Sequence, residues 1–196
     1  MDEKEFNRRS NVSIHWLNES TNLRGSAAAL WASMDGEVSR GIAERFGLGG
    51  WFSMKAAVPP VFRMICGLSL ELLYKAVIVN QHKKIPPAHH KLPTLAEMAG
   101  VPVPPNDKKL LDILTEEITW AGRYPLPKPK KREDVAKLSA LRLEALYDRK
   151  PFGKRHVLVP NGALSWDGFN RIWCKGAEYY THPDYEHPEL PSGEDP

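Results

Sequence analysis

Arginine and histidine side chains can act together on phosphate groups, and this chain offers two short-range combinations of them. Arg149 precedes His156 with six residues between them, and Arg8 and Arg9 precede His15 at similar spacing. Imidazole can transfer a proton near neutral pH, whereas guanidinium can hold a phosphate through two hydrogen bonds. Twelve arginines and seven histidines produce about one such match by chance. Arg149 and His156 are nevertheless the candidate catalytic pair, because they precede the last predicted helix.

A basic segment near residue 130 is the second candidate, because lysine and arginine bind nucleic-acid phosphates. The sequence KPKKR at 128–132 contains Lys130, Lys131 and Arg132. We expect this proline- and lysine-rich run to be extended and exposed. It is either an electrostatic contact for nucleic acid or a solvated linker.

Arg123 and Tyr124 precede that run and are the third candidate. In a binding site, Arg123 would face a phosphate in a cleft while Tyr124 stacked on a base. In the structural alternative, Pro125 ends a helix, Tyr124 packs, and Arg123 contacts the last helical carbonyls or a carboxylate such as Glu71. The sequence leaves both interpretations open.

The sequence predicts neither a metal site nor a cofactor. His82, His89 and His90 are loosely spaced and interrupted by two prolines, and no cysteine lies near them. The glycines at 47–50 lack the Lys-Ser/Thr that follows a phosphate-binding loop. No Ser–His–Asp or Cys–His arrangement can be inferred from the spacing of these residue types.

Composition is that of a folded domain without a membrane span. The chain has 196 residues, of which 42% are hydrophobic and 26% charged. Its two cysteines imply no disulfide framework and favour a reducing compartment. The N-terminus has no apolar leader, and charged residues interrupt the most apolar run, 61–79. We therefore expect a cytoplasmic protein that does not enter the membrane.

Charge is distributed unevenly along the chain. Residues 183–196 carry five acids and no lysine or arginine, which leaves 27 basic and 19 acidic residues elsewhere. A basic body suits RNA or a nucleotide, although surplus lysine is also common on solvated surfaces. We expect one domain over residues 1–182, followed by an acidic, proline-rich, disordered tail over 183–196.

Apolar residues three and four positions apart predict a mostly helical chain. The strongest stripe follows Pro59-Pro60 and continues to about residue 81. Thr94 and Glu97 fit a capping box at the start of a short helix, and Asn106 or Asp107 and Ser165 or Asp167 can cap later ones. The other expected helices lie at about 20–34, 38–46, 94–100, 107–121, 135–149 and 165–180.

The segment RHVLVP within residues 155–164 is rich in β-branched residues and is expected to form a short strand, hairpin or ordered loop. The other connections between helices are short. The predicted fold class is therefore all-α, an up-and-down helical bundle.

Residues 68–127 resemble the core of HEPN domains. The likeness rests on an ordered series of features: Glu71 and Lys75 in a helix, Pro86-Pro87, His90-Lys91-Leu92, a short helix from Leu95 to Gly100, and Arg123-Tyr124-Pro125. Family members usually carry Asp at the position of Lys91. HEPN domains are small helical bundles, often dimeric, in bacterial and archaeal toxin–antitoxin and antiviral systems.

The resemblance implies a bundle of HEPN type but only a broad functional class. Many HEPN domains are metal-independent ribonucleases with Arg followed by His after four to six residues, which would assign catalysis to Arg149 and His156. Others bind nucleotides, RNA or proteins, and for these Lys75 and His90 join Arg123, Tyr124 and the basic run as ligand-binding candidates.

The sequence thus favours a cytoplasmic HEPN-like homodimer that binds RNA or a nucleotide in a cleft near Arg123 and the basic run. Such a protein would be an accessory or sensor in a defence, stress or toxin–antitoxin module. One rival is a ribonuclease with Arg149 and His156 at a dimer cleft. The other is a non-catalytic module that binds a protein partner.

Overall fold

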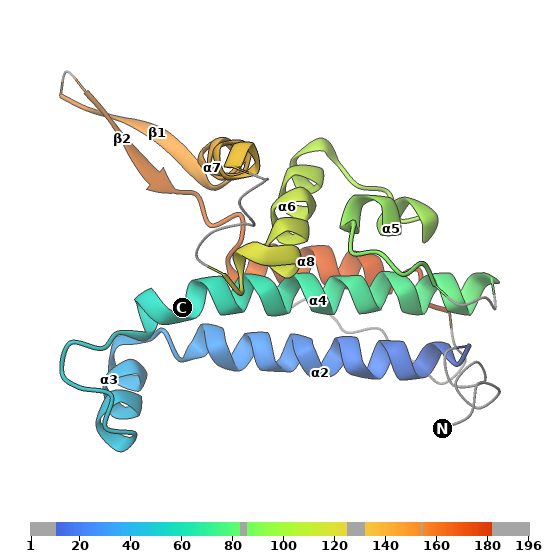
Figure 1. The fold of residues 1–196 in the computed structure, drawn as a ribbon, viewed down its shortest axis with the longest axis horizontal. Coiled ribbons are helices and arrows are strands. Elements are labelled where there is room, and N and C mark those ends of the chain that lie inside the picture. The colour runs from blue at the N-terminus through green and yellow to red at the C-terminus, as the bar shows by residue number, and fades with distance from the viewer. Residues whose placement is uncertain (1–10, 83–85, 125–131, 154, 182–196) are drawn as a thin grey trace.

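Two long helices form the base of the protein, seen in Figure 1 as antiparallel blue and green ribbons. The computed structural model describes residues 11–82, 86–124, 132–153 and 155–181. Helix α2 (Ser13–Ala32) packs along helix α4 (Met54–His82), and α3 (Gly36–Arg45) lies in the connection at one end. The chain is mostly helical, as expected from its apolar periodicity.

The second layer lies on the other side of α4 (Figure 1). It contains α5 (Leu92–Met98), α6 (Pro105–Glu116), a short π-helix η1 (Glu117–Ala121) that continues α6, and α8 (Trp166–Ala177). Helix α7 (Arg132–Leu146) contacts α6 at the edge of this layer. Among the described helices, none combines the length and apolar character needed to cross a bilayer.

Helix α4 is central to the core because both layers cover it. Its residues from Ser69 to Val79 are buried, apart from Leu72, which is half-buried. Where α2 crosses it, the Ser20 hydroxyl donates to the Ser69 carbonyl at 2.7 Å and the Ser69 hydroxyl donates to the Ser20 carbonyl at 2.8 Å. The indole of Trp173 on α8 donates to the Ser20 hydroxyl at 3.0 Å. These small, hydrogen-bonded serines let three helices meet without an unsatisfied polar group.

A β-hairpin follows α7 and projects from the helical body (Figure 1). Strands β1 (Tyr147–Phe152) and β2 (Arg155–Pro160) pair antiparallel, and Gly153 in the turn has φ of 60°. The predicted hairpin begins earlier than expected, because the helix expected to reach residue 149 ends at Leu146. Pro151 explains the difference: proline cannot continue the helical hydrogen bonds and biases the residue before it toward extended backbone.

Four expected helix starts are wrong. Helix α2 begins at Ser13, whereas the sequence predicted a start near residue 20. Helix α4 begins at Met54, so Pro59 and Pro60 lie inside it; proline leaves the Lys55 and Ala56 carbonyls without helical donors, and these two residues are exposed. Thr94 lies inside α5 rather than at its cap.

The N-cap of α6 is Pro104, so neither Asn106 nor Asp107 caps that helix. Asp107 instead accepts hydrogen bonds from Arg171 of α8 at 2.6 and 3.0 Å. The Ser165 cap of α8 is confirmed, because its side chain accepts a hydrogen bond from the Gly168 amide. Asp107 thus forms a tertiary ion pair with Arg171, although its position in the sequence also fits a local helix cap.

Gly168 offers a test of the α8 start. A Cβ built there would lie 2.2 Å from the Ala163 carbonyl oxygen, a backbone atom that cannot move freely. We expect Gly168→Ala to lower the free energy of unfolding by about 2 kcal/mol through overpacking, measured by urea denaturation followed by circular dichroism. Gly25→Ala in α2 is the matched control, since a Cβ there has no neighbour within 4 Å, and it should raise stability by about 0.5–1 kcal/mol. Equal effects at both positions would contradict the packing described for α8.

Candidate functional site

The hairpin, residues 147–160 with Lys154 not described, is a basic arm, hereafter the hairpin arm. Arg149, Lys150 and Arg155 are all exposed, and among the described residues no carboxylate forms an ion pair with any of them. Two exposed lysines of α6 are paired by contrast: Lys108 with Asp112 at 3.0 Å, and Lys109 with Glu144 at 2.6 Å. The arm therefore presents positive charge that no described acid neutralises.

Exposed apolar side chains accompany these charges. Phe152 at the end of β1 is 71% exposed, and Leu158 on β2 is 49% exposed. An aromatic ring among unpaired cations offers a stacking surface beside phosphate-binding groups.

Strand register places the candidate catalytic residues on one face of the arm. Arg149 pairs with Leu158, and Pro151 pairs with His156. Side chains directly opposite one another share a face, as do residues two apart in a strand. Arg149 and His156 are thus diagonal neighbours, with a separation of about 7 Å expected from sheet geometry. Both are exposed, and neither lines any of the four hollows found on the surface.

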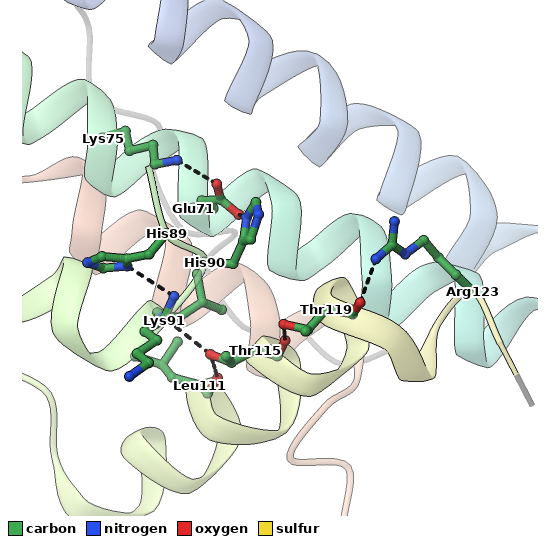
Figure 2. A network of polar contacts seen from close by, with 10 residues as sticks. Glu71, Lys75, His89, His90, Lys91, Leu111, Thr115, Thr119 and Arg123 are labelled. Carbon is green, nitrogen blue, oxygen red and sulfur yellow. Dashed lines mark hydrogen bonds and ion pairs between the residues drawn. The ribbon is translucent and has the colours of Figure 1, made fainter. Parts of the chain in front are cut away.

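Lys75 and His90, both predicted to bind a ligand, meet at the buried carboxylate of Glu71 (Figure 2). The Lys75 ammonium donates to Glu71 Oε1 at 2.7 Å, and His90 Nδ1 lies 2.9 Å from Oε2. Lys75 is only 7% exposed, and its ammonium also lies 5.9 Å from the centre of the Trp16 ring. Lys75 is thus paired within α4, and its ammonium is not presented to solvent. The His90 contact with Glu71 is the one that joins the segment before α5 to α4.

Arg123 and Tyr124 lie at the end of η1, away from the Glu71 carboxylate (Figure 2). Arg123 Nη2 donates to the Thr119 carbonyl at 2.5 Å, and the guanidinium carbon lies 5.5 Å from the centre of the Tyr124 ring. The carbonyl contact is the one that the structural alternative expected. Tyr124 is 57% exposed, so the packing described for it is the contact with the Arg123 guanidinium. Neither residue lines the groove between α5, α6 and α7 or the hollow beside α3.

Several predicted residues cannot be placed. Lys130 and Lys131 lie outside the described residues, as do Arg8 and Arg9. Arg132 begins α7, but its side chain is not among those described.

Sequence analysis missed the carboxylate that positions the arm. Glu117 in η1 is fully buried and accepts from Arg63 Nε of α4 at 2.7 Å and from Arg142 Nη2 of α7 at 2.5 Å. It thereby ties the helix that carries the hairpin to the body. Its partners lie 54 and 25 residues away in the chain, so no local spacing could have indicated them.

The sequence also did not indicate the hydrogen-bond partner of the Leu92 amide at the start of α5. Lys91 is the N-cap residue and gives no side-chain cap. The Thr115 hydroxyl of α6 accepts from the Leu92 amide at 3.1 Å and donates to the Leu111 carbonyl at 2.8 Å (Figure 2). A side chain from another helix therefore performs the capping role.

A groove of about 850 Å³ lies between α5, α6 and α7. Val101, Leu138 and Leu141 contribute apolar surface, and charged residues of both signs surround them. Lys91 and Thr115 line it, and its described lining includes no predicted site residue.

The described residues include neither a cysteine with a lowered pKa nor a group of metal ligands. Burial raises the pKa of the Cys66 thiol well above its ordinary value, and burial also raises that of Cys174, which disfavours the reactive thiolate. In the described part of the chain, no three His, Cys, Asp or Glu residues are grouped so as to hold a metal ion.

Comparison with known proteins gives no match to any family, curated protein or solved structure. Functional argument therefore rests on the residues described above. The hairpin arm is the candidate interface, because it combines unpaired charge, exposed aromatic surface and the predicted Arg–His pair.

The Glu71–Lys75 pair can be tested through stability. Glu71→Gln leaves the buried Lys75 ammonium without a counter-charge and should lower the free energy of unfolding by about 3 kcal/mol in urea denaturation. The double variant Glu71→Leu/Lys75→Met removes both charges and should recover most of that loss, because apolar replacement of a buried pair is often neutral.

Lys108→Met is the control for this series, since it breaks an exposed pair and should change stability by less than about 1 kcal/mol. A Glu71→Gln protein as stable as the parent would show that Lys75 does not depend on the Glu71 charge.

Proposed function

We propose that this chain is a HEPN-like RNA-binding protein whose hairpin arm holds single-stranded RNA. The observation that carries the proposal is the set of exposed arm cations without carboxylate partners, next to the exposed ring of Phe152. The order of sequence features over residues 68–127 supports the HEPN-like part of the proposal and its placement in a defence, stress or toxin–antitoxin module.

The chemistry of the arm favours RNA over an isolated nucleotide. The arm is a projecting ribbon with both strands exposed, and a nucleotide site would usually be a concave pocket. Lys150 and Arg155 share a face of the ribbon with Phe152, so phosphates along one strand can contact these two cations while an unpaired base stacks on Phe152. A strand that wraps round the ribbon reaches Arg149 on the other face. Single strands suit this arrangement because their bases are free to leave the stack.

RNA binding is tested by fluorescence anisotropy with a labelled single-stranded RNA of mixed sequence over a range of salt concentrations. Arg149→Ala/Lys150→Ala/Arg155→Ala should weaken binding at least tenfold. It should also reduce the slope of log affinity against log salt by about 2, as expected for three lost phosphate contacts on a single strand. Phe152→Ala should weaken binding about fivefold to a hundredfold through lost stacking, with little change in slope.

The matched control removes three lysines elsewhere on the surface, by Lys55→Ala/Lys108→Ala/Lys109→Ala, and so changes net charge equally. Circular dichroism should give the same spectrum for all variants. The proposal fails if the arm and control variants lose affinity equally, because binding would then reflect net charge rather than the arm. It also fails if the parent protein binds no RNA.

A second candidate, a metal-independent ribonuclease, is favoured by the shared face of Arg149 and His156. His156 would accept the proton of a ribose 2′-hydroxyl, whose oxygen then attacks the adjacent phosphorus and expels the 5′-oxygen of the next nucleotide. The products are a 2′,3′-cyclic phosphate and, once the leaving oxygen takes up a proton, a 5′-hydroxyl. Arg149 would neutralise charge that develops on the phosphate.

Cleavage is measured with a fluorophore–quencher RNA in the presence of EDTA. If His156 transfers the proton, His156→Ala should lower the rate by a factor of about 10²–10⁴ while RNA binding persists. Cleavage that is unchanged in this variant would remove His156 from the reaction. Binding without cleavage by the parent protein would leave the RNA-binding proposal standing alone.

A further inference from the structure

Exposed apolar side chains gather at the end of the protein formed by α3 and the loop that follows it. This α3 surface consists of Val38, Phe46, Leu48 and Trp51, which are 47%, 67%, 39% and 88% exposed. The four side chains come from α3 and the loop that follows it, and tryptophan is among the residues that contribute most to protein interfaces. The α3 surface lies at the end of the two base helices, apart from the hairpin arm (Figure 1).

The loop that carries Trp51 is held by defined hydrogen bonds. The Leu48 amide donates to the Ala43 carbonyl at 2.9 Å and the Gly47 amide to the Glu44 carbonyl at 3.3 Å, which is a Schellman end to α3. Gly47 has φ of 63°, as this helix end requires. The Met54 amide donates to the Ser39 hydroxyl at 3.0 Å and so anchors the loop to α3. The exposed indole is therefore presented by an ordered turn.

A hollow of about 530 Å³ adjoins the exposed indole. The backbone of Gly49 and Gly50 and the ring of Phe52 form one side, and α3 forms the other with Arg40 and Glu44. Because Gly50 and Phe52 line the hollow, Trp51 stands at its edge. Arg40 and Glu44 are exposed, and no ion pair is formed by either among the described residues.

We propose that a second copy of this chain docks on the α3 surface, with Trp51 of each copy seated in the hollow of the other. A projecting ring and a hollow on the same surface are the requirement for a two-fold, self-complementary interface. The charges fit this arrangement, because Arg40 of one copy faces Glu44 of the second copy twice in the pair. An anionic membrane is the poorer occupant, since Glu37 and Glu44 accompany Arg40 and Arg45 on α3.

The test is the oligomeric state of the full chain, measured by sedimentation velocity over a concentration series at physiological salt. The parent should dimerise, and Trp51→Ala should weaken dimerisation at least tenfold. Phe152→Ala removes another exposed aromatic ring, that of the hairpin arm, and should leave dimerisation unchanged. This control also separates the inference from RNA binding, which depends on the arm.

Charge exchange identifies the second copy as the occupant. Arg40→Glu alone and Glu44→Arg alone each place like charges opposite one another and should be monomeric. An equimolar mixture of the two variants restores both opposite-charge contacts and should form heterodimers, and these should disappear when Trp51→Ala is added to both. Each of these results supports an interface in which Arg40 of one copy faces Glu44 of the other.

Other outcomes overturn the proposal. A monomeric parent excludes it, as does a dimer that is insensitive to Trp51→Ala. A mixture of the two charge variants that stays monomeric excludes the facing of Arg40 and Glu44. A monomeric parent that floats with vesicles containing anionic lipid, and loses flotation on Trp51→Ala, would assign the surface to a membrane instead.

Discussion

The contact between Ser20 and Ser69 is the constraint on which the rest of the structure depends. Each hydroxyl donates to the backbone carbonyl of the other residue, and Trp173 donates to the Ser20 hydroxyl. Three helices that are distant in sequence are thereby joined at a buried point, where larger side chains would keep the backbones apart. Buried hydrogen bonds are directional, so they specify one arrangement of α2, α4 and α8 that apolar packing alone would leave less defined.

A buried carboxylate performs a comparable role for the outer layer. Glu117 holds Arg63 and Arg142 at once, and it lies where α6 changes from α-helical to π-helical hydrogen bonding. The Gly122 amide donates to the Glu117 carbonyl at 2.9 Å, the longer-range bond of a π-helix. Burial of a charge is costly unless it is paired, and two arginines offset part of that cost through Glu117 Oε1. Glu117 Oε2 and Arg142 Nε are buried without a hydrogen-bond partner among the described residues. One consequence is that the position of α7, and therefore of the hairpin arm, depends on an ion cluster inside the protein.

The candidate functional surfaces lie apart from this ionic and hydrogen-bonded framework. The arm presents cations that no described acid neutralises, and the α3 surface presents Trp51 and Phe46. Neither surface contributes to the central core, so substitutions in them can change binding while the fold persists. The Glu71 cluster differs from them, because Lys75 pairs with Glu71 inside the core and His90 joins the segment before α5 to α4.

The amino-acid sequence alone is sufficient for the helical class of this protein and for the approximate position of most helices. Apolar residues recur every three or four positions wherever one helical face is buried, and that period is a local property. Local chemistry also indicates the Ser165 cap and a β-structure near RHVLVP. It does not indicate the start of α4 or the strand at 147, where proline effects compete with apolar periodicity.

Only the tertiary structure decided which charged and polar side chains meet. Glu71 and His90 are 19 residues apart, Glu117 and Arg63 are 54 apart, and Ser20 and Trp173 are 153 apart. Such contacts leave no period in the sequence, because they depend on how whole helices pack. Lys75 and Glu71 are four residues apart on one helix, a spacing that is visible in the sequence. The burial of their side chains depends on helix packing and is not.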